Sequence, residues 1–168
     1  MRRWQAVCAG AGITLVLAAC AGRQAPPGVY HSDKGYRLTL PGPDWEPIRG
    51  GRADLELRHR QAKAGILVNA SCEPRLTQRT VSVLTREILA GFSAREVHER
   101  DVASVAGREA AHVVVEGQSG PRRDRVRVEL YVARDERCVY DLLYAAAPED
   151  FAVGRGDFRR LVGTFALD

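Results

Sequence analysis

One strand with two apolar faces limits the fold of this chain more than any other feature. Residues 138–144 read Cys-Val-Tyr-Asp-Leu-Leu-Tyr, and only Asp141 interrupts the apolar character of the run. A strand that is apolar on both faces is usually covered on both sides by other elements. We therefore expect residues 138–144 to lie at the centre of a sheet that helices cover on both faces.

Other segments of strand length accompany this run. Residues 36–40 alternate apolar and polar side chains before Pro41 breaks the pattern, and residues 55–60 alternate in the same way. Val, Ile, Leu and Tyr are frequent at strand length in residues 66–72, 110–116, 126–133 and 139–145. Short consecutive strands with hairpin connections predict an antiparallel sheet.

The clearest hairpin has its turn at Gly117-Gln118-Ser119-Gly120-Pro121. Residues 113–116 lead into this turn, residues 125–132 lead out of it, and its tip carries Arg122 and Arg123. Alternate side chains of a strand point to opposite faces. The return strand therefore has one face with Arg125, Arg127, Glu129 and Tyr131, and another with Val126, Val128, Leu130 and Val132.

Two helical regions are predicted. The first has Thr80 as its N-cap and one apolar stripe at helical spacing, made of Val81, Leu84, Ile88, Leu89 and Phe92. The second covers residues 149–162, where Gly154 and Gly156 interrupt the pattern, so we expect two short helical pieces. Strands and helices in this order give an α+β class.

The N-terminus has the form of a secretory leader. Arg2 and Arg3 precede a small, apolar run, and the run ends in Leu17-Ala18-Ala19-Cys20. This ending resembles the lipobox of bacterial lipoproteins. The resemblance implies that residues 1–19 are removed and that Cys20 carries acyl chains. An uncleaved anchor is the alternative, but the apolar stretch is shorter than the about 20 residues that a spanning helix needs.

A lipid-modified Cys20 implies a protein held on the membrane of the cell envelope. Two or more acyl chains give stable attachment, and Ala21 in place of an aspartate indicates the outer membrane, facing the periplasm, if the source has two membranes. Residues 20–28 contain Pro26 and Pro27 and predict a tether, followed by a single domain at 29–168. Removing the leader lowers the formal net charge from +4 to +2, which gives no case for nucleic acid as a partner.

The mature chain resembles the PsbP-like fold. The resembling residues are the segment Gly35-Tyr36-Arg37-Leu38-Thr39-Leu40-Pro41, then Asp44-Trp45, and near the end Asp157-Phe158 and Phe165. The resemblance implies an antiparallel sheet of six to seven strands with helices packed on its faces. That family includes photosystem extrinsic subunits and bacterial lipoproteins. It brings no catalytic set, so no functional residue is carried over.

Two cysteines remain in the mature chain, Cys72 and Cys138. In an oxidising envelope compartment an even pair within one domain predicts a disulfide. Such a bridge would restrain the unfolded chain by up to about 4 kcal/mol in the loop-entropy model. Two buried free thiols are the alternative.

The evidence for catalytic or metal-binding side chains is weak. Ser119 and His112 faintly resemble segments of trypsin-like proteases, but both lie on one hairpin without an acid placed to orient the histidine. The histidines have no metal-site spacing, although His59 and His112 could be neighbours across the sheet. We expect no enzyme activity, no cofactor and no bound metal.

A basic surface is the best functional clue. It would form if two regions of the chain lie close together, and it consists of Arg58, Arg60, Lys63, Arg122, Arg123, Arg125 and Arg127. Such a surface could face anionic headgroups or an acidic partner, although a solvated sheet face is the commoner outcome.

The first hypothesis is a non-catalytic lipoprotein that binds an envelope protein or supports assembly. The alternative is a small-molecule or lipid carrier, with a pocket between sheet and helix that Tyr140 and Tyr144 could line.

Overall fold

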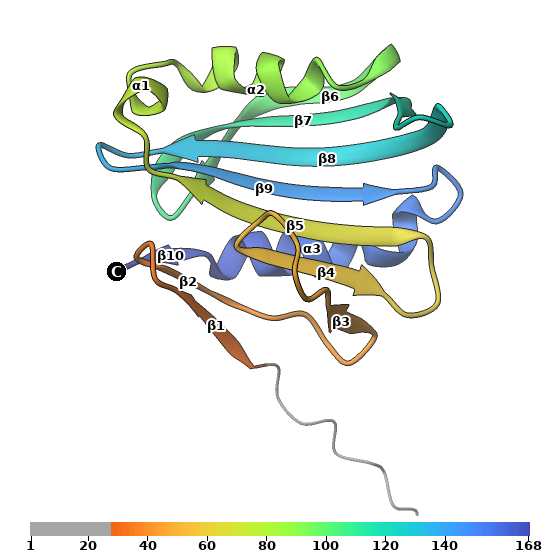
Figure 1. Cartoon of the computed structure of the whole chain (residues 1–168), viewed down its shortest axis with the longest axis horizontal. Coiled ribbons are helices and arrows are strands. Elements are labelled where there is room, and N and C mark those ends of the chain that lie inside the picture. Colours follow the sequence, from red (N-terminus) through yellow and green to blue (C-terminus); the bar gives the residue numbers. More distant parts are fainter. Residues whose placement is uncertain (1–27) are drawn as a thin grey trace, which may run out of the picture.

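Seven strands form one antiparallel sheet in the computed structural model, which describes residues 28–168 (Figure 1). Every pair of neighbouring strands in this sheet is antiparallel, as predicted. Across the sheet the strands are β3 (Trp45–Pro47), β4 (Leu55–His59), β5 (Ala64–Ser71), β9 (Val139–Ala146), β8 (Asp124–Arg134), β7 (Arg108–Ser119) and β6 (Ser93–Val105).

Strand β9 lies in the middle of this sheet, between β5 and β8. Tyr140, Leu142 and Tyr144 are fully buried on the face that helix α3 (Phe151–Thr164) covers. Val139 and Leu143 point to the opposite face and pack in the cluster under helix α2 (Val81–Leu89). The predicted central strand with helices on both faces is therefore confirmed.

Helix α2 begins where the sequence predicts. The side-chain oxygen of Thr80 accepts a hydrogen bond from the backbone N–H of Val83, and Leu84 and Leu89 are buried against the sheet. A short helix, α1 (Pro74–Thr77), precedes it and was not predicted.

Helix α3 is continuous, so the prediction of two short pieces is wrong. A Cβ atom at Gly154 would lie only 2.7 Å from the Trp45 ring and 3.0 Å from Tyr144. The Gly154 N–H donates to the Tyr144 hydroxyl, and the Trp45 indole N–H donates to Asp157, at 2.9 Å. Gly154 therefore allows α3 to pack closely on β3 and β9 and does not interrupt the helix.

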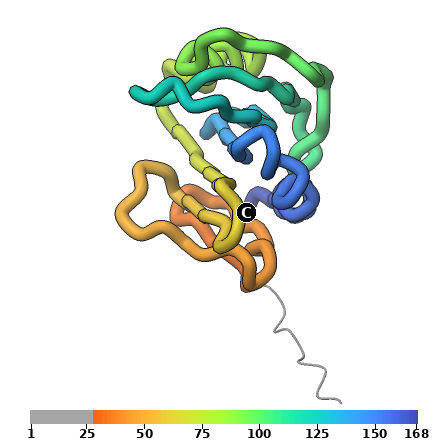
Figure 2. Tube along the Cα trace, turned by 90° about the vertical axis from the view of Figure 1, so that its right-hand side faces the viewer, coloured from red at the N-terminus to blue at the C-terminus, as the bar shows by residue number. Residues whose placement is uncertain are grey.

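A small second sheet closes the end of the domain where the described chain begins. It consists of β1 (Val29–Ser32), β2 (Tyr36–Thr39) and β10 (Ala166–Leu167), with β2 in the middle. The Tyr36 ring stacks on Phe165 with ring centres 5.1 Å apart. In Figure 2 these N-terminal strands lie at one end of the molecule, and α2, in green, lies at the other.

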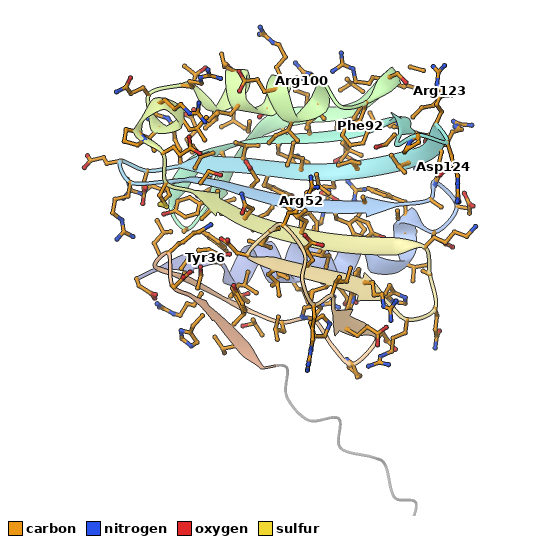
Figure 3. The ribbon with its side chains drawn as sticks, viewed as in Figure 1. Tyr36, Arg52, Phe92, Arg100, Arg123 and Asp124 are labelled. Atoms are coloured by element: carbon orange, nitrogen blue, oxygen red, sulfur yellow. A yellow bond between two sulfur atoms is a disulfide. The ribbon has the colours of Figure 1, made fainter. Side chains whose placement is uncertain are left out.

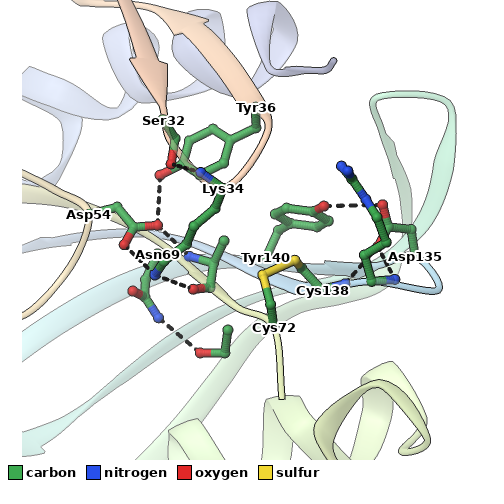
Figure 4. The surroundings of a disulfide bond; sticks show 12 residues. Ser32, Lys34, Tyr36, Asp54, Asn69, Cys72, Asp135, Cys138 and Tyr140 are labelled. Atoms are coloured by element: carbon green, nitrogen blue, oxygen red, sulfur yellow. Dashed lines mark hydrogen bonds and ion pairs between the residues drawn. A yellow bond between two sulfur atoms is a disulfide. The ribbon is translucent and has the colours of Figure 1, made fainter. Parts of the chain in front are cut away.

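A disulfide joins Cys72, just after β5, to Cys138, just before β9, and confirms the predicted bridge (Figure 4). The β5–β9 register ends with Ser71 opposite Val139, which brings the two cysteines face to face. Nearby, Asp54 accepts hydrogen bonds from the Lys34 ammonium at 2.6 Å and from the Tyr36 hydroxyl at 3.1 Å. These contacts fasten the small sheet to the large one. Between residues 28 and 168, no helix has the length and apolar character needed to cross a membrane.

Candidate functional site

A cluster of charged side chains with a buried centre lies between α3 and the strands β6 to β8. At its centre Glu129 is fully buried and His112 is 5% exposed. One oxygen of the Glu129 carboxylate lies 3.0 Å from His112 Nε2 and accepts a hydrogen bond from Arg159 Nε at 2.8 Å. The other oxygen accepts from Arg155 Nε at 2.8 Å. One carboxylate on β8 thus binds two elements of the fold, β7 and α3.

Two acidic residues of β6 complete this cluster. Asp101 lies 3.0 Å from His112 Nδ1, and Glu99 accepts from Arg155 Nη2 at 2.6 Å and lies 3.3 Å from Arg159 Nη2. The ion pairs therefore connect the edge strand β6 to α3.

The environment shifts the pKa of both central groups. Burial alone would raise the pKa of Glu129, but hydrogen bonds from His112, Arg155 and Arg159 outweigh it and hold this pKa at about 2. The hydrogen bond to Glu129 raises the pKa of His112, against the effect of burial, and Asp101 raises it further. A histidine whose two ring nitrogens both contact carboxylates, and whose pKa is raised, suits a structural role better than that of a general base.

The arrangement gives no support to a protease-like site. Ser119 lies at the far end of β7 from His112, about 23 Å along the strand at 3.3 Å per residue. His59 lies on β4, and strands β5, β9 and β8 separate it from β7, so the suggested His59–His112 contact is wrong. Within residues 28–168, no group of three or more His, Cys, Asp or Glu side chains could hold a metal ion.

The basic side chains singled out in the sequence fall into separate groups. Arg58 and Arg60 pair with Glu46, at 2.6 and 3.2 Å. Arg125 and Arg127 both pair with the buried carboxylate of Glu116.

The loops at one end of the sheet bring part of this basic set together. Lys63, Arg122 and Arg125 line a hollow of about 700 Å³, and the acidic Asp124 and Glu149 share it. Arg123 lies next to Arg122 in the turn between β7 and β8. Figure 3 labels Arg123 and its neighbour Asp124. The structure thus assembles Lys63 with Arg122 and Arg125, and places Arg58 and Arg60 against Glu46 on a different strand pair.

A larger groove lies between α2 and the edge formed by β6 and β7. Its volume is about 780 Å³. Val97 and Val102 of β6 face it and are 49% and 72% exposed, although both are apolar. The remaining apolar lining comes from α2 and β7, with Val81, Leu89, Ala110, Ala111, Val113 and Val115. Most of the surface that lines this groove is therefore apolar.

Arginines surround the apolar lining. Arg86 of α2 and Arg95 and Arg100 of β6 line the groove, and Arg95 donates to the Leu89 carbonyl at 3.0 Å. Figure 3 shows Arg100 at the end of the molecule where α2 lies. Of the two acidic side chains in the lining, Asp101 is engaged by His112, and Glu109 lies near the β6–β7 turn. The groove is therefore apolar along its floor and positively charged at its rim.

The predicted lining of a pocket by Tyr140 and Tyr144 is wrong. Both side chains are buried in the core under α3, on the opposite face of the sheet from the groove. The position between sheet and helix was correctly expected, but the helix is α2 and the strands are β6 and β7.

Solved structures share this arrangement of strands and helices. Cyanobacterial PsbP (CyanoP) from Synechocystis superposes with a TM-score of 0.60 at 13% identity, over 90% of this chain and 99% of that one. The fold is PsbP-like. A crystal structure from Bacteroides thetaiotaomicron matches with a TM-score of 0.61 at 7% identity, over 86% of this chain, which spans only 49% of that protein.

A third structural neighbour is LpqN, described as involved in cell envelope biogenesis of Mycobacterium tuberculosis. It matches with a TM-score of 0.56 at 13% identity, over 85% of this chain and 86% of its own. No protein-family model matches the sequence, and no curated protein is detectably similar to it. At these identities the neighbours show the PsbP-like fold alone.

The residues that line the groove of the PsbP-like domain were not predicted from the sequence, because β6 was not predicted. That strand carries charged side chains and is largely exposed, so it lacks an apolar pattern. The one available signal was the pair of valines, Val97 and Val102, within an otherwise polar segment.

Proposed function

We propose that this chain is a non-catalytic lipoprotein of the cell envelope whose PsbP-like domain acts by binding. Cys20, outside the described residues, would carry the lipid, and the lipobox-like sequence before it supports this anchor. The description of LpqN, a structural neighbour, agrees with a role in the envelope. If the source has two membranes, we expect the outer membrane with the domain facing the periplasm.

The groove between α2 and β6–β7 is the observation that carries this proposal. An apolar surface that stays exposed marks an interaction site more often than a polar one does. The described chain enters the domain at β1, and Figure 1 shows β1 and α2 at opposite ends of the molecule. With an anchor that precedes β1, the groove would face away from the membrane, where an envelope partner can reach it.

The ion pairs under α3 support a binding role over catalysis. His112 and Glu129 are the most deeply buried titratable pair among these contacts, and each is saturated by partners of opposite charge. Groups held in this way stabilise the fold and leave little capacity for proton transfer.

Site-specific photo-crosslinking in the cells that make the protein tests the proposal. A benzophenone amino acid replaces Val102, which lines the groove, or Val153, which is similarly exposed on α3. We expect adducts from position 102 and few from position 153. Equal adducts from both positions, or none from position 102, would contradict a groove that binds.

Mass spectrometry of the mature N-terminus tests the anchor separately. The expected result is a chain that begins at Cys20 and carries acyl groups. A chain that begins at another residue, or an unmodified Cys20, would remove the lipoprotein part of the proposal and leave the binding part standing.

The mass of the adduct separates two classes of occupant. A partner protein gives a large shift on a denaturing gel, whereas a carried small molecule or lipid changes only the mass of the chain itself. The groove's position between helix and sheet favours the carrier as the second candidate, because small-molecule pockets commonly lie in such clefts and span about 300–1,000 Å³.

A further inference from the structure

We infer that the groove between α2 and β6–β7 binds an amphiphile with a single acyl chain and an anionic head. This inference rests on the carrier form of the proposed function and names the class of its ligand. Three features of the groove lead to it: the kind of side chains on its floor, the charge of its rim and the irregular edge strand.

The floor of the groove suits a hydrocarbon chain. The β6–β7 register sets Val97 opposite Val115 and Val102 opposite Ala111, so aliphatic side chains run along both strands. No Phe, Tyr or Trp side chain lines the groove in the part of the chain that the structure describes. Sites that dominate protein–protein binding are enriched in Trp, Tyr and Arg anchors seated in pockets. A trough of small aliphatic groups instead matches a flexible acyl chain.

The rim of the groove selects a negative head. Arg100 lies opposite Val113 on the groove face of β6, and Arg86 lines the groove from α2. Neither arginine forms an ion pair with another residue between 28 and 168. Guanidinium groups bind carboxylate and phosphate oxygens through paired hydrogen bonds. The head would lie at the arginines, and the tail would run from Arg100 along the aliphatic floor past Val102.

The edge strand disfavours a peptide as the occupant. Strand β6 is the outer strand of the sheet, and its register shifts between Ser93 and Glu96 and again between Val97 and Glu99. Bulges and charged side chains are the devices by which proteins block the addition of another strand at an edge. An extended peptide therefore lacks a regular backbone to pair with, whereas an acyl chain needs only side-chain contacts.

The experiment uses the full chain reconstituted in phosphatidylcholine vesicles. A C16 fatty acid with a diazirine in its tail is added, irradiated and located by peptide mass spectrometry. We expect the label in peptides from α2, β6 and β7. Unlabelled palmitate and lysophosphatidic acid should both compete, whereas hexadecanol and hexadecylamine should compete at least threefold less well. A difference between the two anionic competitors tells a carboxylate head from a phosphate head.

Chain length and two variants sharpen the test. Removing one methylene should weaken competition by about two- to fourfold at equal free aqueous concentration of the competitor, as expected for a chain that is largely buried. Val102→Asp should reduce labelling at least fivefold. The added carboxylate would lie against the apolar tail and would repel the anionic head. Arg100→Gln should remove the preference of palmitate over hexadecanol. Val153→Asp, a matched change at an exposed valine on α3, should leave labelling unchanged.

Two results would overturn the inference and differ in what they leave standing. Labelling spread over the whole chain, or equal competition by the alcohol and the acid, shows that the groove does not select an anionic acyl chain. If the benzophenone at position 102 then captures a protein, the groove binds a partner and the proposed function survives. If neither probe reacts in the groove, the proposed function fails as well.

Discussion

The imidazole of His112 and the carboxylate of Glu129 lie 3.0 Å apart across β7 and β8, and neither side chain is more than 5% exposed. Two arginines of α3 share the same carboxylate. A buried charge of this kind is stable only while all its partners are present, because removal of one leaves the others without compensation.

Glu129→Gln should therefore lower the free energy of unfolding by about 2–4 kcal/mol at pH 7. The neutral amide cannot balance His112, Arg155 and Arg159. Urea denaturation followed by circular dichroism measures the change. Glu99→Gln is the matched control, since Glu99 contacts the same two arginines but is 39% exposed, and it should cost no more than about 1 kcal/mol. Equal losses in both variants would show that burial of Glu129 adds nothing.

Acid should remove the contribution of Glu129. The pKa of Glu129 is about 2 in the folded chain, below its ordinary value of 4.5, so its contribution is complete above about pH 4.5 and is lost as the pH falls towards 2. This linkage amounts to about 3 kcal/mol. His112 contributes to stability in a different pH range. Because its pKa is raised in the folded chain, its contribution is present at low pH and is lost only as the pH rises.

Unfolding free energies of the wild type and Glu129→Gln, measured from pH 6 to pH 2.5, isolate this effect. The two curves should approach each other as the pH falls. Parallel curves over the whole range would mean that Glu129 is not held ionised by its partners.

Alanine substitutions at two glycines of α3 should have opposite effects on stability, because only one of these glycines lies at the tight contact with β3. Gly154→Ala should destabilise the protein by about 1–3 kcal/mol, because the added methyl group meets the Trp45 and Tyr144 rings. Gly163→Ala should stabilise it by up to about 1 kcal/mol, since no atom lies within 4 Å of the added carbon and alanine favours the helix. Thermal unfolding of both variants measures the contrast, and a stabilised Gly154→Ala would refute the close packing.

Strands with a clear apolar pattern could be predicted from the sequence, and contacts between distant elements could not. Strand β9 was predictable because an apolar run on both faces requires a central position. The Cys72–Cys138 bridge followed from two cysteines in one domain. Strand β6 was missed because an edge strand faces water with much of its length and so carries charged side chains.

The roles of Gly154 and of the arginines depend on neighbours that only the folded chain brings close to them. From the sequence, Gly154 was predicted to interrupt the helix. In the structure it allows α3 to pack closely on Trp45, which is far away in the sequence. The basic surface was split because Arg58 meets Glu46 and Arg127 meets Glu116, and both pairings depend on strand register. The groove needs α2 beside β6 and β7, so its arginines could not be grouped from their order along the chain.

Asp141 gives the last prediction, because one oxygen of its half-buried carboxylate is buried without compensation. Its Oδ1 is buried and has no hydrogen-bond partner among the described residues, and burial raises its pKa to about 6. The folded-state pKa lies above the ordinary value of 3.8, so ionisation costs nothing below about pH 4 and destabilises the protein increasingly as the pH rises through 6.

Asp141→Asn removes this charge at every pH. The variant should match the wild type near pH 4 and exceed its unfolding free energy by about 3 kcal/mol at pH 8. Asp135→Asn is the contrasting control, because the Asp135 carboxylate accepts backbone N–H bonds from Arg137 and Cys138, and its loss should destabilise the chain. Denaturant titrations at the two pH values decide the matter. A variant no more stable than the wild type at pH 8 would show that Asp141 ionises without cost in the folded chain.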